Sequence, residues 1–321
     1  MRRFIAARLA QSAIIVLVVT VVAFLLIRLA PGEPFSYDAP NMTPALRAQW
    51  REQFGYNKPI GVQLVRYLTN VAHGNLGYST LQRRPVREAI ADALPRTLML
   101  AGVGLVASFI LGIGLGALAA AKRRSWWDRV IVLFCTVTYS IPDFWLALVV
   151  QLGLAYWIRL FPVSGTADPL IQQYGGGWLA FTDRIRHLAL PVFTITLVIT
   201  SIVARFQRAA LIDVLPSDYV RTARAKGASE RTVIARHALR NALTPTITVL
   251  GLLFPTVLGG AFFIEYVFGW HGLGWLAINS VEGLDYDVAT GGVIVAGVIV
   301  TLGSLLADIL AAIADPRVRD G

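Results

Sequence analysis

The sequence predicts an all-α, polytopic membrane protein with six membrane-spanning helices, and three observations carry this prediction. Of the 321 residues, 56% are hydrophobic and only 15% are charged, against about a quarter in soluble domains. The mean hydropathy is +0.62. Six apolar runs each reach the length of roughly 20 residues that a helix needs to cross a bilayer. This composition argues against both a soluble enzyme and a disordered chain.

The expected spans, in chain order, are Leu9–Leu29, Thr97–Ala121, Val130–Ile158, Leu188–Leu211, Thr244–Phe268 and Val288–Ala314. A signal peptide would also begin with basic residues such as Arg2 and Arg3. The first apolar run is too long for one, however, and no small-x-small cleavage site follows it, so we interpret it as a retained span. In the second run, Gly112-Ile-Gly114-Leu-Gly116 lets another backbone approach closely and predicts a helix–helix contact.

The basic residues indicate how the chain is oriented. The formal net charge of +10 would suggest a nucleic-acid partner in a soluble protein. With the N-terminus and the C-terminus both in the cytoplasm, most Lys and Arg residues lie in cytoplasmic loops, as the positive-inside rule requires. Essentially all of the net charge then faces the cytoplasm. We therefore interpret the charge as topology and expect no nucleic-acid partner.

The loops differ in size and composition. The segment between the first two runs is long and predicted to lie outside, and Pro85–Leu94 within it predicts a short amphipathic helix with Val86, Ile90 and Leu94 on one face. The Tyr156–His187 loop is also predicted to lie outside. The single cysteine, Cys135, excludes an intrachain disulfide bond.

The stretch of residues 205–243 is a long cytoplasmic loop with a helical pattern. The residues around Gly227 predict a helix, a glycine turn and a second helix that Ser229 caps. Arg236 and Arg240 share a face and can meet lipid phosphates or the acids of a partner. An ordinary basic inner loop that only obeys the charge rule is the alternative interpretation.

This loop resembles the EAA loop of ABC importer permeases, whose core is Glu-Ala-Ala, three residues and then Gly. Here Arg221-Thr222-Ala223 occupies the Glu-Ala-Ala place, and Gly227 matches the glycine. The general pattern continues with Ile-x-Leu-Pro, where this chain has His237-Ala-Leu239-Arg240. Both departures agree with the variant of the peptide/nickel branch of that family.

The resemblance extends over nearly the whole chain. The matching segments run, in order, from Arg28-Leu-Ala-Pro-Gly-Glu-Pro34 through Gly74–Ser79, Arg84–Val86, Leu94-Pro95, Ser140–Trp145, Phe161–Gly165 and Glu265–Gly274 to Asp315–Arg319. The sequence is therefore identified as a member of the dipeptide/oligopeptide/nickel-type importer permeases, as the first of the two permeases. The resemblance implies an N-terminal region over residues 1–96, a type I importer core over 97–315 and a cytoplasmic tail over 316–321.

The resemblance also implies partners. Such a subunit pairs with a second homologous permease, two ABC ATPase subunits and an extracytoplasmic solute-binding protein in the bacterial plasma membrane. ATP and Mg²⁺ would be bound by the ATPases, and we expect no cofactor, metal or catalytic residue in this chain, which has no phosphate loop. The residues that would transmit ATPase closure are Arg221, Thr222, Ala223, Arg224, Ala225, Lys226, Gly227 and Ala228.

Three acids lie at predicted membrane depth, where ionisable side chains are candidates for function. Asp143 follows Pro142, which we expect to break the third helix, and its carboxylate would face the substrate path, with pairing to a neighbouring span as the alternative. For Glu265 we expect an interfacial structural hydrogen bond or a gate contact. For Asp308 we expect a role in helix packing or in a salt bridge.

Two points stay open at this level. The solute is expected to be a short peptide, but the same branch serves glutathione, nickel chelates and oligosaccharides. A different class of function, an ion-coupled secondary carrier, would use Asp143 or Asp308 as its carboxylate relay. The glycine-centred loop speaks against such a carrier, since a carrier that works alone needs no docking site for an ATPase.

Overall fold

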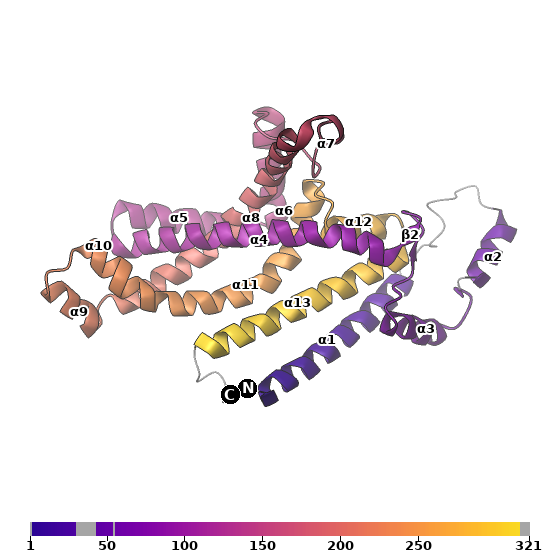
Figure 1. Ribbon diagram of the computed structural model, residues 1–321, viewed down its shortest axis with the longest axis horizontal. Helices are drawn as coiled ribbons and strands as arrows, with labels where there is room; N and C mark the ends of the chain where they lie inside the picture. The colour runs from indigo at the N-terminus through magenta and orange to yellow at the C-terminus, as the bar shows by residue number, and fades with distance from the viewer. Residues whose placement is uncertain (1, 30–42, 54, 315–321) are drawn as a thin grey trace.

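The protein is an elongated bundle of helices in the computed structural model, which describes residues 2–29, 43–53 and 55–314 (Figure 1). Its elements are α1 (Arg2–Leu29), α2 (Pro44–Gln53), α3 (Ile60–Ala72), β1 (Tyr78–Ser79), β2 (Arg84–Pro85), α4 (Val86–Ala121), α5 (Trp126–Ser140), α6 (Asp143–Val150), η1 (Gln151–Trp157), α7 (Pro169–Tyr174), α8 (Gly176–Val214), α9 (Asp218–Ala225), α10 (Glu230–Thr232), η2 (Val233–Ala238), α11 (Leu239–Val267), α12 (Leu273–Glu282) and α13 (Tyr286–Ala314). Helices α9 and α10 lie at one end of the bundle, and α3 and the β1–β2 hairpin lie at the other (Figure 1).

The membrane character of the fold is confirmed. Four helices of the described residues are long and apolar enough to cross a bilayer, namely Ala7–Leu29 of α1, α4, α8 and Tyr286–Leu305 of α13. They correspond to the first, second, fourth and sixth expected spans. The fifth expected span falls in α11, of which Pro255–Val267 is a shorter apolar helix. The total of six spans stays a prediction.

The third expected span is broken, as the position of Pro142 predicts. Helix α5 and the continuous pair α6–η1 meet at an angle of 105°, and together they are apolar enough to form one span. Ile141 and Pro142 both have extended backbone dihedral angles, with ψ of 129° and 136°. Proline disfavours helical dihedrals in the residue before it and has no amide hydrogen to donate, so the helix ends here and restarts at Asp143.

The expectation of a separate short helix over Pro85–Leu94 is wrong. Helix α4 runs without interruption from Val86 to Ala121 and contains Pro95. The predicted apolar face exists, since Val86 and Ile90 are buried and pack with residues of α12 and α13, and Leu94 packs beside them. That packing holds the first turns of α4 against the bundle. The helix therefore begins at Val86, 11 residues before the expected span Thr97–Ala121.

Glycines bring α4 and α8 into close contact, which confirms the helix–helix contact predicted from the Gly-x-Gly-x-Gly run. A Cβ atom on Gly112 would lie 2.6 Å from Val203, and one on Gly116 would lie 2.6 Å from the carbonyl oxygen of Ala204. Gly114, by contrast, has nothing within 4 Å of such an atom. Of the three glycines in the run, only the two that are four residues apart therefore contact α8, as the helical period requires.

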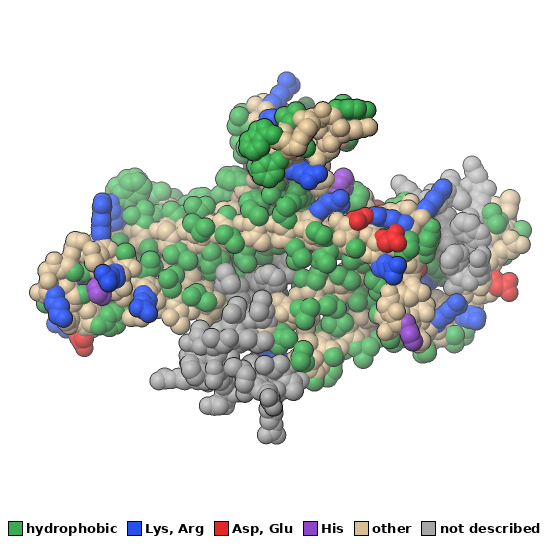
Figure 2. All heavy atoms as spheres, in the orientation of Figure 1, with side chains coloured by type: hydrophobic (Ala, Val, Ile, Leu, Met, Phe, Trp, Pro, Cys, Tyr) green, Lys and Arg blue, Asp and Glu red, His purple; other side chains and the backbone are tan. Residues whose placement is uncertain are grey.

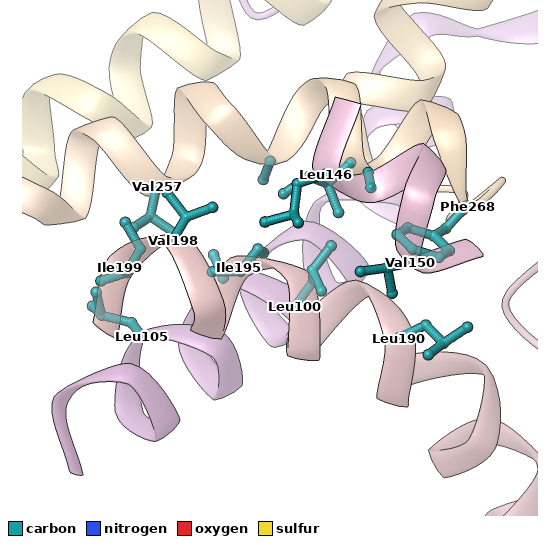
Figure 3. Packing of buried hydrophobic residues seen from close by; sticks show 14 of the residues in the cluster. Leu100, Leu105, Leu146, Val150, Leu190, Ile195, Val198, Ile199, Val257 and Phe268 are labelled. Atoms are coloured by element: carbon teal, nitrogen blue, oxygen red, sulfur yellow. The ribbon is translucent and has the colours of Figure 1, made fainter. Parts of the chain in front are cut away.

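The largest hydrophobic core lies where α4, α6, α8 and α11 meet (Figure 3). Its residues include Leu100 and Leu105 of α4, Leu146 and Val150 of α6, Leu190, Ile195, Val198 and Ile199 of α8, and Val257 and Phe268 in and after α11. Long, mostly apolar helices that pack on one another in this way leave further apolar side chains on the outer surface of the bundle, as expected in lipid (Figure 2).

The β1–β2 hairpin is fastened to the start of α13. The Asp285 carboxylate accepts a hydrogen bond from the Ser79 hydroxyl at 2.6 Å and another from the Leu81 amide at 3.2 Å. The Tyr78 amide donates to Asp287 at 3.3 Å. The hairpin is thus held by acids that lie more than 200 residues later in the chain.

Candidate functional site

The motif around Gly227 forms a helix, a glycine turn and a second helix, as predicted, and the second helix continues from α10 through η2 into α11. Helix α9 ends at Ala225, and Gly227 has a φ angle of +83°, a left-handed conformation that glycine adopts without a steric penalty. The Ser229 hydroxyl accepts a hydrogen bond from the Thr232 amide, so the predicted N-cap is confirmed. Lys and Arg side chains gather at this end of the bundle (Figure 2).

One face of α9 is buried against the chain's own helices. Val220 is fully buried and Ala223 is 8% exposed. They form a cluster with Leu211 of α8, Val233 of η2 and Ala242 of α11. Of the eight residues expected to contact the ATPase, Ala223 therefore points into this chain, and Ala228 also packs against the cluster.

The other face of α9 is exposed, and it holds Arg221, Thr222 and Ala225, with Lys226 directly after the helix. Arg224 is only partly available, because it forms a two-pronged ion pair across the turn. Its Nε donates to Glu230 Oε2 at 3.1 Å and its Nη2 donates to Glu230 Oε1 at 2.8 Å. These hydrogen bonds raise the pKa of Arg224 and lower the pKa of Glu230, so both groups are charged at neutral pH. The pair links the last turn of α9 to the first residue of α10.

A second ion pair joins α8 to the start of α5. Arg208 Nε donates to Asp128 Oδ1 at 2.7 Å, and Arg208 Nη2 donates to Asp128 Oδ2 at 2.9 Å. The Arg124 amide also donates to Asp128 at 2.9 Å. Sequence reasoning counted Asp128 and Arg208 as cytoplasmic charges and did not pair them. The only available signal was that each lies at the polar end of an apolar run.

A buried amide links α8 to α11 near the same level. Gln207 is completely buried, and its Oε1 accepts a hydrogen bond from the Thr246 hydroxyl at 2.8 Å. Its amide nitrogen has no hydrogen-bond partner. Together with the Asp128–Arg208 pair, this contact ties α8 to both α5 and α11. Sequence reasoning did not single out Gln207.

Asp143 lies at the first turn of α6 and lines a cavity of about 220 Å³ between α5, α6, α8 and α11. The other described lining residues are uncharged: Tyr139, Ile195, Val198, Ile199, Ile202, Thr256, Val257, Ala261 and Ile264. The Arg205 guanidinium lies 4.4 Å from the Tyr139 ring centroid. A single carboxylate among uncharged, mostly apolar residues can attract one cationic group.

Glu265 is completely buried and holds the start of α12. Its Oε1 accepts a hydrogen bond from the Thr97 hydroxyl at 2.6 Å, and its Oε2 accepts one from the Gly274 amide at 2.7 Å. A Cβ atom on Gly272 would lie 2.4 Å from the Glu265 carboxyl group. The spacing Glu265-x6-Gly272-Leu-Gly274 thus has a structural reason: the carboxylate caps a helix, and the glycine makes room for it.

The loop after η1 and the loop after α11 are joined by hydrogen bonds to backbone carbonyl groups. Gln151 of η1 donates from its side-chain amide to the carbonyl oxygens of Val163 and Val267, at 2.9 and 2.8 Å. The Gly165 amide donates to the Phe268 carbonyl at 2.9 Å. The motif segments Phe161–Gly165 and Glu265–Gly274, which are separate in the sequence, are therefore neighbours. A polar residue inside an apolar run was the signal that would have singled out Gln151.

Asp308 completes the set of expected site residues. The backbone of Asp308 belongs to α13, but its side chain lies outside the described residues, as do the tail 316–321 and the motif segments 30–34 and 315–319. Among the residues that the structure describes, no three His, Cys, Asp or Glu side chains are grouped so that they could hold a metal ion.

The fold and these sites define a multi-pass helical membrane protein with a folded helix pair on one side. The chain belongs to the family described as binding-protein-dependent transport system inner membrane component, whose model matches residues 112–320. The model of the N-terminal part of such membrane components matches residues 1–101.

Named relatives match along nearly their whole length. The oligopeptide transport system permease protein AppB of Bacillus subtilis is 36% identical, with 99% of this chain and 100% of that protein covered. The di/tripeptide transport system permease protein DppB of Pseudomonas aeruginosa is 36% identical, with 99% of each covered. A putative peptide permease protein of Brucella suis is 35% identical, again with 99% of each covered.

Proposed function

We propose that this chain is one of two permease subunits of an ATP-driven importer and carries short peptides across the bacterial plasma membrane. Its partners would be a second homologous permease, two ABC ATPases and an extracytoplasmic solute-binding protein. The ATPases would bind ATP and Mg²⁺, and this chain would perform no covalent chemistry. The family membership and the peptide permeases among its relatives support this proposal.

The observation that carries the proposal is the exposed face of α9. Arg221, Thr222 and Ala225 lie on it, with Lys226 directly after them, on a short helix whose opposite face is built into the bundle. A docking helix needs both properties. Its outer face must be free to enter the ATPase, and its inner face must be rigidly packed so that a movement is passed on. The net positive charge of this face fits an acidic groove on the partner.

The packing beneath α9 provides the route for that movement. The cluster around Val220 and Ala223 includes residues of α4, α8, η2 and α11. A rigid-body shift of the ATPase would therefore act on three membrane helices at once, and the Asp128–Arg208 pair would extend it to α5. Alternating access would follow from movement of these helices against the second permease.

The cavity at Asp143 is the place in this chain where the solute would pass. Its apolar walls suit the side chains of a peptide, and the single carboxylate suits a peptide ammonium group. The same role for glutathione, a nickel chelate or an oligosaccharide is the alternative. An oligosaccharide has no cation for Asp143 to attract, so the cavity favours a peptide over an oligosaccharide.

Co-purification with the ATPases tests the docking role. We expect Arg221→Glu to abolish co-elution of the ATPase subunits with the full permease pair. The control is Arg123→Glu, the same charge change at an exposed residue that follows α4 and lies outside the motif. Loss of co-elution in both variants would show that the total charge of this end of the protein matters, and it would contradict a specific docking site on α9. Uptake that survives in cells without any partner ATPase would favour an ion-coupled carrier instead.

A further inference from the structure

A polar pocket lies at the end of the bundle opposite α9. Its volume is about 190 Å³, and it is enclosed by the last turn of α1, the turn before α3, α3 itself and the first turn of α13. The charged and phenolic residues that line it are Arg28, Tyr56, Lys58, Arg66, Tyr67 and Asp287. It is separate from the Asp143 cavity, and neither the docking helix nor the proposed solute path uses it.

The pocket carries an excess of positive charge. Arg28, Lys58 and Arg66 face a single acid, Asp287. Arg28 is the most buried of the three cations, with a side chain that is 14% exposed, and the nearest oxygen of Asp287 is 3.8 Å from its Nη2. Its guanidinium also lies 4.2 Å from the ring centroid of Tyr56, which supports the cation from one side.

Two buried donors in this pocket have no acceptor. Nη1 of Arg28 and the hydroxyl of Tyr67 are both buried and both lack a hydrogen-bond partner. Tyr67 is 8% exposed. Burial raises the pKa of Tyr67, so the phenol keeps its proton and remains a donor at neutral pH. A buried donor without a partner is costly, and two that line one cavity indicate an acceptor that binds between them.

We propose that this pocket binds a phosphate group. Phosphate offers several acceptor oxygens with negative charge, which matches a guanidinium, a phenol, Lys58 and Arg66 arranged around one cavity. Arg28 is the penultimate residue of the apolar run Ala7–Leu29, so it lies at the end of the span, which is the level of lipid headgroups. The phosphate can come from a phospholipid headgroup or from free phosphate. A bound phosphate would tie α1, α3 and α13 together.

Titration calorimetry on the purified permease in detergent tests the site, with two probes. One is inorganic phosphate, and the other is a short-chain phosphatidylglycerol below its micelle concentration. Binding of the lipid alone identifies the headgroup as the source, and binding of inorganic phosphate identifies the free anion. Either result supports the site. If neither probe binds at millimolar concentration, the proposed phosphate site is overturned.

Tyr67→Phe is the sharpest variant, because it removes one unpartnered hydroxyl and leaves the packing intact. We expect about tenfold weaker binding of whichever probe binds, as for loss of a hydrogen bond to a charged group. Lys58→Ala should weaken binding as well. The matched controls are Tyr78→Phe and Arg87→Gln, exposed residues that do not line the pocket. Unchanged binding by Tyr67→Phe, or equal losses in the controls, would contradict the proposal.

Discussion

Arg208 of α8 holds Asp128 at the start of α5 through two parallel hydrogen bonds of 2.7 and 2.9 Å. Asp128 is 5% exposed, so little water competes for its carboxylate. Helices α5 and α6 form the bent pair that carries Asp143 at its break. The Asp128–Arg208 contact attaches the first turn of α5 to α8, and α5 leads directly to the proposed solute site. A two-pronged pair between guanidinium and carboxylate sets the orientation of both side chains as well as their distance.

Asp128→Asn should destabilise the protein by about 1–3 kcal/mol, because Arg208 loses a charged acceptor and the Asn amide places a donor against it. Thermal unfolding of the purified protein measures the effect. The control is Asp218→Asn, whose side chain is 99% exposed and pairs weakly with Arg221. Equal stability of Asp128→Asn and the wild type would show that the pair contributes no net stability.

Gly116→Ala should weaken the seam between α4 and α8. Its Cβ atom would lie 2.6 Å from a backbone carbonyl oxygen, which cannot rotate away as a side chain can. We expect a loss of about 1–3 kcal/mol, as for other overpacked contacts. Gly114→Ala is the matched control on the same helix, since its Cβ would meet nothing within 4 Å. A better helix former there should keep or slightly raise the melting temperature.

Thr97→Val should loosen the start of α12. The hydroxyl both donates to Glu265 and accepts from the Leu273 amide at 2.8 Å, so its loss leaves two buried groups without a partner. The expected cost is about 1–3 kcal/mol, with faster hydrogen exchange at the Leu273 amide. Thr136→Val is the control, because that exposed hydroxyl donates only to a carbonyl of its own helix. If both variants melt alike, Thr97 does not support the cap.

The Arg224–Glu230 pair makes a separate prediction for the docking segment. Arg224→Glu should speed amide exchange in α9 and α10, and the charge swap with Glu230→Arg should restore it. Co-elution of the ATPases should be regained with the swap if Arg224 acts by positioning α9, and should stay lost if Arg224 itself contacts the partner. Because Arg224 lowers the pKa of Glu230, the link persists at neutral pH and weakens only as the pH falls into the range where glutamate is protonated.

Asp143→Asn should reduce uptake of a dipeptide with a free N-terminus by roughly tenfold, as for loss of a contact with a charged group. Uptake of the N-acetylated dipeptide should be the same in both proteins. Liposomes that contain the complete importer provide the measurement, and co-elution of the ATPases should be unchanged. An equal loss for both peptides would assign Asp143 a structural role.

Much of the fold class and part of the site could be predicted without coordinates. The apolar runs predict the membrane spans, because the transfer of each side chain to lipid depends little on its neighbours. The break at Pro142, the turn at Gly227 and the cap at Ser229 are local effects of backbone dihedrals and short hydrogen bonds. The sequence by itself therefore determined the class of protein and the two helices around Gly227, and it singled out the carboxylates that are the candidates for function.

Only the tertiary structure decided which groups meet. Arg208 pairs with Asp128, which lies 80 residues earlier in the chain. The Glu265 carboxylate caps a helix that begins eight residues later, and it also accepts a hydrogen bond from Thr97. The same packing turns Ala223 inward and extends α4 to Val86. The physical reason is that hydropathy and local propensity describe one element at a time, whereas these contacts depend on how several helices pack around shared buried groups.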